Sequence, residues 1–205
     1  MKKLTVLLVV LCTSLVFTTD ATAQKFSGLD KSPADIAYYP ASSREANKMA
    51  RVIYSRPQLK GRSLAELAPV GKVWRTGANE ATEITFYTDA MIGGKTIKAG
   101  SYSLFTIPGE DEWTVILNNN LHQWGAYSYD SDADVVRAMA TPSMDSEELE
   151  AFGIAFDDDG NLVMGWGTQE LPCLSVTNLV GYQIRKAPIW GFFYCSFLRK
   201  FSYFF

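Results

Sequence analysis

Apolar and polar residues alternate with a period of two along much of this chain, and turn-forming residues separate the alternating runs. In residues 83–88, for example, Ile84 and Phe86 alternate with Thr85 and Tyr87. A period of two places alternate side chains on opposite faces of a β-strand, whereas an amphipathic helix needs a period of 3.6. This pattern constrains the fold more than any other feature of the sequence, because it favours strands joined by short turns.

The same pattern predicts eight strands. They are residues 50–55, 83–88, 95–98, 101–107, 113–117, 134–140, 152–156 and 162–166. Gly93-Gly94 is expected to form a hairpin turn into residues 95–98, and Asp157–Asn161 another turn. Within residues 101–107, Tyr102 and Leu104 are expected to face away from Phe105 and Ile107.

Helical signals are sparse. Ser63 and Glu66 have the spacing of a capping box and Pro69 follows, which predicts one short helix at residues 63–67. The lack of long helices and of a βαβ rhythm argues against Rossmann and TIM architectures. We therefore predict an all-β fold: an antiparallel β-sandwich or a small barrel-like sheet of about seven to eight short strands, with one short helix.

The first 23 residues have the parts of a secretory signal peptide. Two lysines precede an apolar stretch (residues 4–17), and Ala21-Thr22-Ala23 provides a small-x-small cleavage site. The apolar stretch is too short for a comfortable transmembrane span. Lipoprotein attachment through Cys12 is the alternative, although the apolar run before that cysteine is very short. We expect cleavage after Ala23 and export from the cytoplasm.

Charge and cysteine content exclude several classes of protein. The chain has 19 Lys and Arg against 22 Asp and Glu, a net charge of −3, which argues against a nucleic-acid partner. Its cysteines are Cys12, Cys173 and Cys195, so residues 24–168 contain none and need a hydrophobic core rather than disulfides. The single histidine, His122, rules out a Cys/His zinc site in that region.

The composition changes near residue 169. Residues 24–168 hold 13 Lys and Arg and 20 Asp and Glu, whereas residues 169–205 hold four basic residues and one acid. The latter segment also carries 10 of the 27 aromatic residues. We therefore divide the chain into a signal peptide (1–23), a β domain (24–168) and an atypical aromatic and basic tail (169–205). The tail has three interpretations: a membrane-contacting segment, an unusual core strand, or the product of a reading-frame slip near Thr168.

Two neighbouring segments concentrate basic residues in an otherwise acidic domain. Guanidinium groups match carboxylate, phosphate or sulfate groups, a tryptophan ring can stack on a ligand, and an asparagine amide both donates and accepts hydrogen bonds. These segments predict a non-catalytic site for an anionic or sugar-like ligand. Its expected residues are Arg56, Arg62, Trp74, Arg75 and Asn79. The alternative is that the arginines pair with nearby acids such as Glu80 and Glu83 and fix two loops.

Two further functions stay open. Histidine exchanges a proton near neutral pH, so His122 is the candidate general base of an envelope hydrolase, oriented by Asp130 or Glu80. No Gly-x-Ser-x-Gly motif surrounds any serine, and residues 24–168 offer no nucleophilic cysteine. The third function is a structural or partner-binding envelope protein that uses a sheet edge.

Metal and cofactor motifs are incomplete. Asp130, Asp132 and Asp134 have the opening spacing of a calcium loop, but Val135 and Thr141 stand where such a loop needs glycine and glutamate. The chain has neither a P-loop nor a dinucleotide-binding fingerprint. We expect no metal and no cofactor.

Several segments resemble one known family. Gly71-Lys72-Val73-Trp74-Arg75-Thr76-Gly77-Ala78-Asn79-Glu80 and Ala99-Gly100-Ser101-Tyr102-Ser103-Leu104-Phe105-Thr106-Ile107-Pro108-Gly109 carry most of the resemblance. Residues 54–57, 60–62, 113–118 and 124–130 match it in order. The family is the secreted bacterial group known as domain of unknown function 2911, and the resemblance covers about residues 25–168. It implies a β-domain in the periplasm or on the surface of a Gram-negative bacterium and no established activity. Members usually continue past residues 166–168 with a short alternating strand, and this chain departs from that pattern from Gln169 onward.

Overall fold

The computed structural model describes residues 24–175, 177 and 178. The expected signal peptide, and the expected tail from residue 179 onward, lie outside the described residues. The chain divides into two compact units, residues 1–30 and 31–205. In the first unit, residues 24–30 are exposed and form no helix or strand. All the described secondary structure belongs to the second unit.

The second unit is built from antiparallel strands, as the alternating sequence predicts. Within the described residues no helix is long and apolar enough to cross a membrane. In chain order the elements are β1 (Ala34–Tyr39), β2 (Ala50–Ser55), α2 (Leu64–Leu67), β3 (Thr82–Phe86), β4 (Ala90–Ile92), β5 (Lys95–Ile97), β6 (Gly100–Ile107), β7 (Trp113–Asn118), η1 (Ser131–Ala133), β8 (Asp134–Ala140), β9 (Ser143–Phe156), β10 (Asn161–Ser175) and β11 (Thr177–Asn178).

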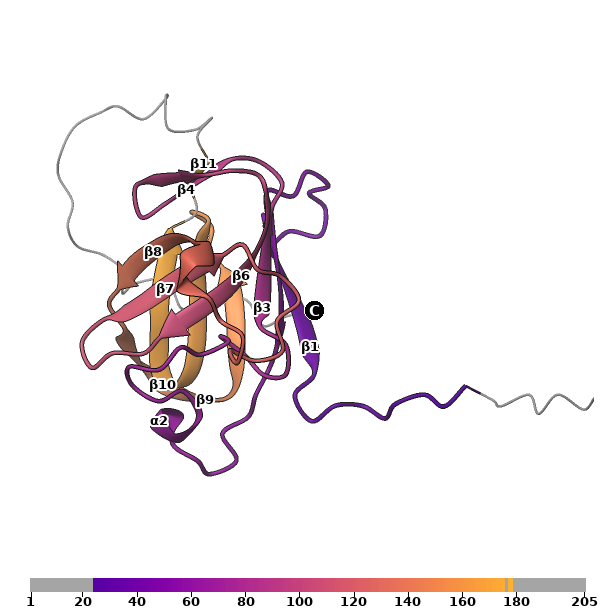
Figure 1. The fold of residues 1–205 in the computed structure, drawn as a ribbon, viewed down its shortest axis with the longest axis vertical. Coiled ribbons are helices and arrows are strands. Elements are labelled where there is room, and N and C mark those ends of the chain that lie inside the picture. The colour runs from indigo at the N-terminus through magenta and orange to yellow at the C-terminus, as the bar shows by residue number, and fades with distance from the viewer. Residues whose placement is uncertain (1–23, 176, 179–205) are drawn as a thin grey trace, which may run out of the picture. The chain divides into compact units, whose positions relative to one another are not determined.

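The largest sheet has six strands in the order β1-β2-β3-β6-β7-β8 (Figure 1). Strands β9 and β10 form a long two-stranded ribbon, drawn in orange behind β6, β7 and β8 in Figure 1. The ribbon and the large sheet share one hydrophobic core. A third, small sheet has the order β11-β4-β5. The all-β prediction is therefore confirmed.

Most predicted strands are present, and the differences have physical reasons. The short helix is confirmed: the backbone N–H of Ser63 donates to the carboxylate of Glu66 at 2.7 Å. Strand β1 was not predicted because its Ile36 and Tyr38 lie on the outer face of the sheet while Asp35 faces inward beside Tyr54. The Gly93-Gly94 turn does lead into β5, but its other strand is the three-residue β4 rather than β3. The N-terminal half of β9 is polar and exposed, so it lacks an alternating signal.

Strand β6 places Tyr102 and Leu104 on the opposite face from Phe105 and Ile107, as predicted, and both faces are buried. Tyr102 and Leu104 belong to the main core between the large sheet and the ribbon. Phe105 belongs to a second, smaller core on the opposite face, and Ile107 packs against it. The outer face of the large sheet is thus covered at β6 and β7 by the loops described below.

Four large rings meet in the main core, and we call them the ring cluster: Trp74, Trp113, Phe152 and Trp166. Trp74 lies parallel to Trp166, with centroids 5.5 Å apart and planes 15° apart. Its ring meets Trp113 and Phe152 edge to face, at 6.4 Å and 5.2 Å. Offset stacking and edge-to-face contacts are the favourable geometries for aromatic pairs. The cluster therefore joins the loop before β3 to the large sheet and to the ribbon.

Replacing Trp74 with alanine should lower the free energy of unfolding by about 3–5 kcal/mol, because a large buried ring is removed from a packed site. Chemical denaturation of the variant would measure this loss. Trp124→Ala is the matched control: its ring is 62% exposed, so the change should stay within about 0.5 kcal/mol. Equal losses for the two variants would contradict the core position of Trp74.

Candidate functional site

The loop that precedes β3 is held in an unusual conformation by buried hydrogen bonds. The backbones of Trp74 and Thr106 exchange two bonds, of 2.7 Å and 3.0 Å, which pair the loop with β6. Thr76 is fully buried and has a φ of 53°, which is rare for a β-branched residue. Its carbonyl accepts from the Oγ1 of Thr82 at 2.6 Å, and its own Oγ1 lies 3.2 Å from that of Thr106. These contacts offset the backbone strain.

The same loop also needs a glycine at position 77, because its backbone there lies close to β2. A Cβ at this position would lie 3.0 Å from the carbonyl oxygen of Ser55 and 3.1 Å from the Oγ1 of Thr82. The loop backbone thus packs directly against β2, and a side chain would force the two apart. The anchored residues 74–77 therefore fix the position of residues 78–81, which follow them in the loop.

The second loop, between β7 and β8, pairs with the first. The backbone of Ala81 donates to the carbonyl of Gln123 at 2.8 Å, and that of Gly125 donates to the carbonyl of Asn79 at 2.9 Å. Its other side is tied to β6, because the hydroxyl of Ser103 donates to the carbonyl of Asn120 at 2.7 Å. We call residues 74–81 and 119–130 together the loop pair.

A small hydrophobic core lies beneath the loop pair. Ala81, Phe105 and Ile116 are buried there, and Ala126 and Tyr129 of the second loop pack against them. The ring of Tyr129 meets Phe105 edge to face at 5.1 Å. The loop pair is therefore seated on the outer face of the large sheet by apolar contacts as well as by hydrogen bonds.

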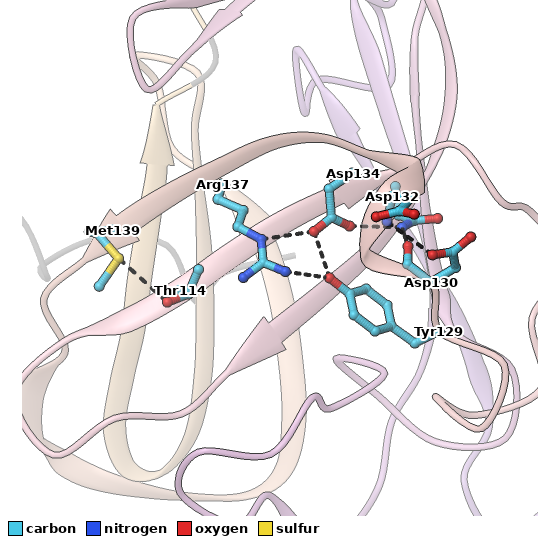
Figure 2. Close-up of polar contacts among 8 residues, drawn as sticks. Thr114, Tyr129, Asp130, Asp132, Asp134, Arg137 and Met139 are labelled. Carbon is cyan, nitrogen blue, oxygen red and sulfur yellow. Dashed lines mark hydrogen bonds and ion pairs between the residues drawn. The ribbon is translucent and has the colours of Figure 1, made fainter.

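The far end of the second loop is fixed to β8 by a polar network, which Figure 2 shows. The hydroxyl of Tyr129 donates to Oδ2 of Asp134 at 2.6 Å, and Arg137 donates to the same oxygen at 2.8 Å. Arg137 also donates to the hydroxyl of Tyr129 at 2.9 Å, and the side-chain amide of Asn118 donates to Oδ1 of Asp134 at 2.8 Å. All three partners orient one carboxylate.

Burial and the bond to the Asp134 carboxylate raise the pKa of Tyr129 to about 12. The phenol therefore stays protonated and keeps donating across the physiological range. The bond to Asp134 likewise raises the pKa of Arg137 above its ordinary value, which keeps the guanidinium charged. The hydrogen bonds of this network therefore hold the second loop to β8 throughout the physiological pH range.

The exposed surface of the loop pair carries aromatic rings beside a cation. Trp124 is 62% exposed and Tyr127 is 84% exposed. Arg75 is half-buried, and its Nη1 donates to the carbonyl of Asn79 at 3.2 Å. A Cβ added to Gly125 would lie 2.8 Å from the Tyr127 ring and 3.1 Å from Nη1 of Arg75, so both side chains converge on this glycine.

Three of the four described non-glycine residues with a positive φ belong to the loop pair, and the fourth is Lys60. Thr76, Asn79 and His122 have φ values of 53°, 61° and 58°, and all three belong to the loop pair. Residues in the left-handed region cost free energy, so they persist where the surrounding structure holds them. Such positions often mark functional surfaces.

The five predicted ligand residues have different partners in the structure. Trp74 lies in the ring cluster, 6% exposed, with its faces and edges in contact with other rings. Arg56 pairs with Asp35 at 3.1 Å and donates to the carbonyl of Phe152 at 2.9 Å. Arg62 donates to two carbonyls of its own loop, those of Gln58 and Leu59. Arg75 and Asn79 are joined by a hydrogen bond, and the use of the five residues as one ligand site stays a prediction.

The carboxylate next to His122 differs from the two that the hydrolase hypothesis names. Its side chain is 85% exposed, and its Nδ1 lies 3.3 Å from Oε1 of Glu83, which also accepts its backbone N–H at 2.8 Å. Asp130 instead caps η1 by accepting from the backbone of Asp132. Glu80 is exposed and its backbone pairs with that of Trp124. The carboxylate beside the imidazole is thus one that the hypothesis did not name.

Sequence reasoning missed Trp124 and Tyr127 as surface residues. The signal was present, since two large aromatics follow a histidine and flank a glycine in a loop segment. Exposure could not be read from that segment, because Tyr129, two residues further on, is packed on the second core.

Metal ligands do not converge in the described part of the chain, where no group of three His, Cys, Asp or Glu side chains could hold an ion. The aspartates of the calcium-like segment have other roles. Asp130 caps η1, and Asp134 belongs to the network with Tyr129 and Arg137.

Substituting Gly125 with alanine should destabilise the protein in two ways. Its φ of 70° costs any non-glycine residue about 1–2 kcal/mol, and the added Cβ must also displace Tyr127 or Arg75. Gly94→Ala is the control, because Gly94 has a φ of 78° with nothing within 4 Å. Chemical denaturation should show a larger loss for Gly125→Ala. Equal losses would mean that the two side chains move freely, which contradicts a fixed surface.

The phenol of Tyr129 should ionise with a midpoint near pH 12, measured as the absorbance difference between the wild type and Tyr129→Phe. Because the folded-state pKa lies above the ordinary value of 10.0, the stabilising effect of this group is complete below pH 10 and is lost as the pH rises towards 12. A midpoint near the ordinary value would show that the network with Asp134 does not form.

Comparison with curated proteins and with solved structures finds no match. The family model described as protein of unknown function (DUF2911) matches residues 37–174. This match includes the loop pair, the ribbon as far as residue 174, and the large sheet apart from the first three residues of β1. The chain therefore belongs to the DUF2911 family.

Proposed function

We propose that this protein is a non-catalytic binding module of the bacterial cell envelope whose loop pair takes an anionic, sugar-like ligand. One observation carries the proposal: the exposed Tyr127 ring and the Arg75 guanidinium converge on Gly125, and the exposed Trp124 directly precedes this glycine in the chain, on a loop pair that the fold holds in place. Export rests on the signal-like residues 1–23, which lie outside the described residues.

The chemistry of these groups suits an acidic sugar. Exposed aromatic faces pack against the apolar C–H faces of sugar rings, and a guanidinium pairs with a carboxylate or sulfate through charge-assisted hydrogen bonds. Tryptophan, tyrosine and arginine are also the residues that contribute most to binding energy at interfaces. The carbonyl of Asn79 already holds one arm of Arg75, so the guanidinium is partly oriented before a ligand arrives.

Recognition of an anion here must be local. Residues 24–168 carry 13 basic and 20 acidic residues, so the field of the domain as a whole repels anions. The neighbouring Glu83 is occupied by the backbone and ring of His122. Binding therefore depends on direct contact with Arg75 and the two aromatic rings, and long-range steering contributes little.

The geometry favours binding over hydrolysis. A general base is normally oriented by a second group and held close to the reacting atoms. The ring of His122 is 85% exposed, and Asp130 and Glu80 serve other contacts. The hydrolase stays an alternative to this proposal.

A partner-binding role at a sheet edge is the second candidate. Strand β8 ends the order of the six-stranded sheet, and its Met139 is 59% exposed. An edge strand presents backbone groups that can pair with another chain. This role would use the edge of the large sheet that β8 forms, and it would not need Arg75.

Arg75→Ala should abolish stabilisation by oligogalacturonate, a uronic acid oligosaccharide, without unfolding the domain. At 100 times its Kd a ligand adds about 2.7 kcal/mol, which thermal-shift assays detect easily. Wild type and Arg62→Ala, a matched arginine outside the loop pair, should both respond, whereas Arg75→Ala and Trp124→Ala should not. A neutral oligosaccharide of equal length should give a weaker response.

The outcomes separate the candidates. A response that survives in Arg75→Ala would place the ligand elsewhere, and global unfolding of that variant would mean that Arg75 is structural. No response of the wild type to either oligosaccharide would overturn the proposed ligand class and favour the partner-binding role.

A further inference from the structure

Two glycines lie directly opposite each other in the middle of the ribbon. Gly153 of β9 pairs with Gly165 of β10, and the next pair on the same face is Ala155 with Val163. Paired residues project from the same face of a two-stranded sheet. The ribbon therefore contributes no side chain of its own at the glycine pair, on the face opposite Phe152 and Ile154, which pack into the main core.

Backbone conformation does not require these glycines, since neither has a φ in the left-handed region. Packing does not require Gly153 either: an added Cβ would come no closer than 4.0 Å to Nη2 of Arg56. At Gly165 the nearest atom would be Cδ1 of Leu149, the far end of a flexible side chain, at 2.7 Å. Glycine weakens a strand interior and often marks the close approach of a ligand or another backbone.

The glycine pair lines a cavity of about 310 Å³, and we call this part of the lining the floor. This volume is at the lower end of the range for small-molecule sites. Leu149, Ala155 and Val163 add apolar surface around the floor. The polar residues of the lining, which we call the rim, come from two parts of the fold: Asp35, Tyr54 and Arg56 from β1, β2 and the residue after β2, and Asp145, Gln169 and Glu170 from the ribbon.

Negative charge predominates in this cavity. Three carboxylates, those of Asp35, Asp145 and Glu170, line the cavity together with a single guanidinium, and the hydroxyl of Ser143 donates to the Glu170 carboxylate at 3.1 Å. That guanidinium belongs to Arg56, which already pairs with Asp35 at 3.1 Å and with the carbonyl of Phe152. A ligand that enters therefore meets an excess of carboxylate oxygens above an apolar floor.

We propose that this cavity binds an ammonium group on a short aliphatic chain, as in a diamine or a lysine side chain. The methylene groups would lie on the apolar surface formed by the glycine pair, Leu149, Ala155 and Val163, and the ammonium would donate to carboxylates of the rim. This site is separate from the loop pair. Its ligand has the opposite charge, and none of its residues belongs to the loop pair.

Isothermal titration calorimetry of the purified protein with cadaverine tests the proposal. Cadaverine should bind saturably, whereas glutarate, a dicarboxylate with a chain of the same length, should not bind. Gly153→Leu should abolish cadaverine binding by filling the floor, and Glu170→Gln should weaken it about tenfold, as expected for the loss of one charge-assisted bond. Glu148→Gln, an acid of a different cavity, is the control and should leave binding unchanged.

Several results would overturn the proposal. These are no saturable cadaverine binding, equal binding of glutarate, or unchanged cadaverine binding in Gly153→Leu. If Gly153→Leu does not fold, Gly153→Ala replaces it, because that Cβ has room, and Glu170→Gln tests the charge independently. None of these variants changes Arg75 or Trp124, so failure here leaves the proposed function of the loop pair intact.

Discussion

The stacking of Trp74 on Trp166 is the contact on which the arrangement of this domain depends. The two rings lie 5.5 Å apart and nearly parallel, and they join residues from the loop before β3 and from β10. Trp113 and Phe152 complete the cluster from β7 and β9. With Trp74 buried in this way, its backbone pairs with Thr106 on β6, and the next residue in the chain, Arg75, emerges at the outer surface. A core contact therefore sets the position of the proposed binding surface.

The loop pair is held from three directions. Buried hydrogen bonds of Thr76 fix the first loop, backbone bonds from Ala81 and Gly125 join the two loops, and Tyr129 fixes the second loop to Asp134. A surface fixed in this way loses little conformational entropy when a ligand binds. The strained backbone at Asn79 and His122 is consistent with a surface whose shape is maintained despite its cost.

The sequence was informative about strands and much less so about the site. Alternation predicts β2, β6 and β8 well because their apolar residues face a core on at least one side. Alternation does not reveal β1, because the inward residues of this strand include a charged aspartate.

The sequence does not show that Trp74 is buried, because the ring on which it stacks, Trp166, is more than 90 positions away. Sequence reasoning therefore treats Trp74 as a ligand-stacking residue. Arg56, Arg62 and Arg75 are close in sequence, but each is held by different partners in the fold, and these partners cannot be read from the sequence. The Gly153–Gly165 pair becomes visible only once the register of β9 and β10 is known.

The central claim is that the loop pair is the surface that binds the ligand, and NMR chemical-shift mapping tests it most directly. On titration with oligogalacturonate, we expect shifts of the Trp124 indole N–H, the Arg75 side-chain N–H groups and the Gly125 amide. The amides of Gly153 and Gly165 should not move, because they belong to the separate cavity in the ribbon. Shifts confined to that cavity, or to the edge strand β8, would contradict the account.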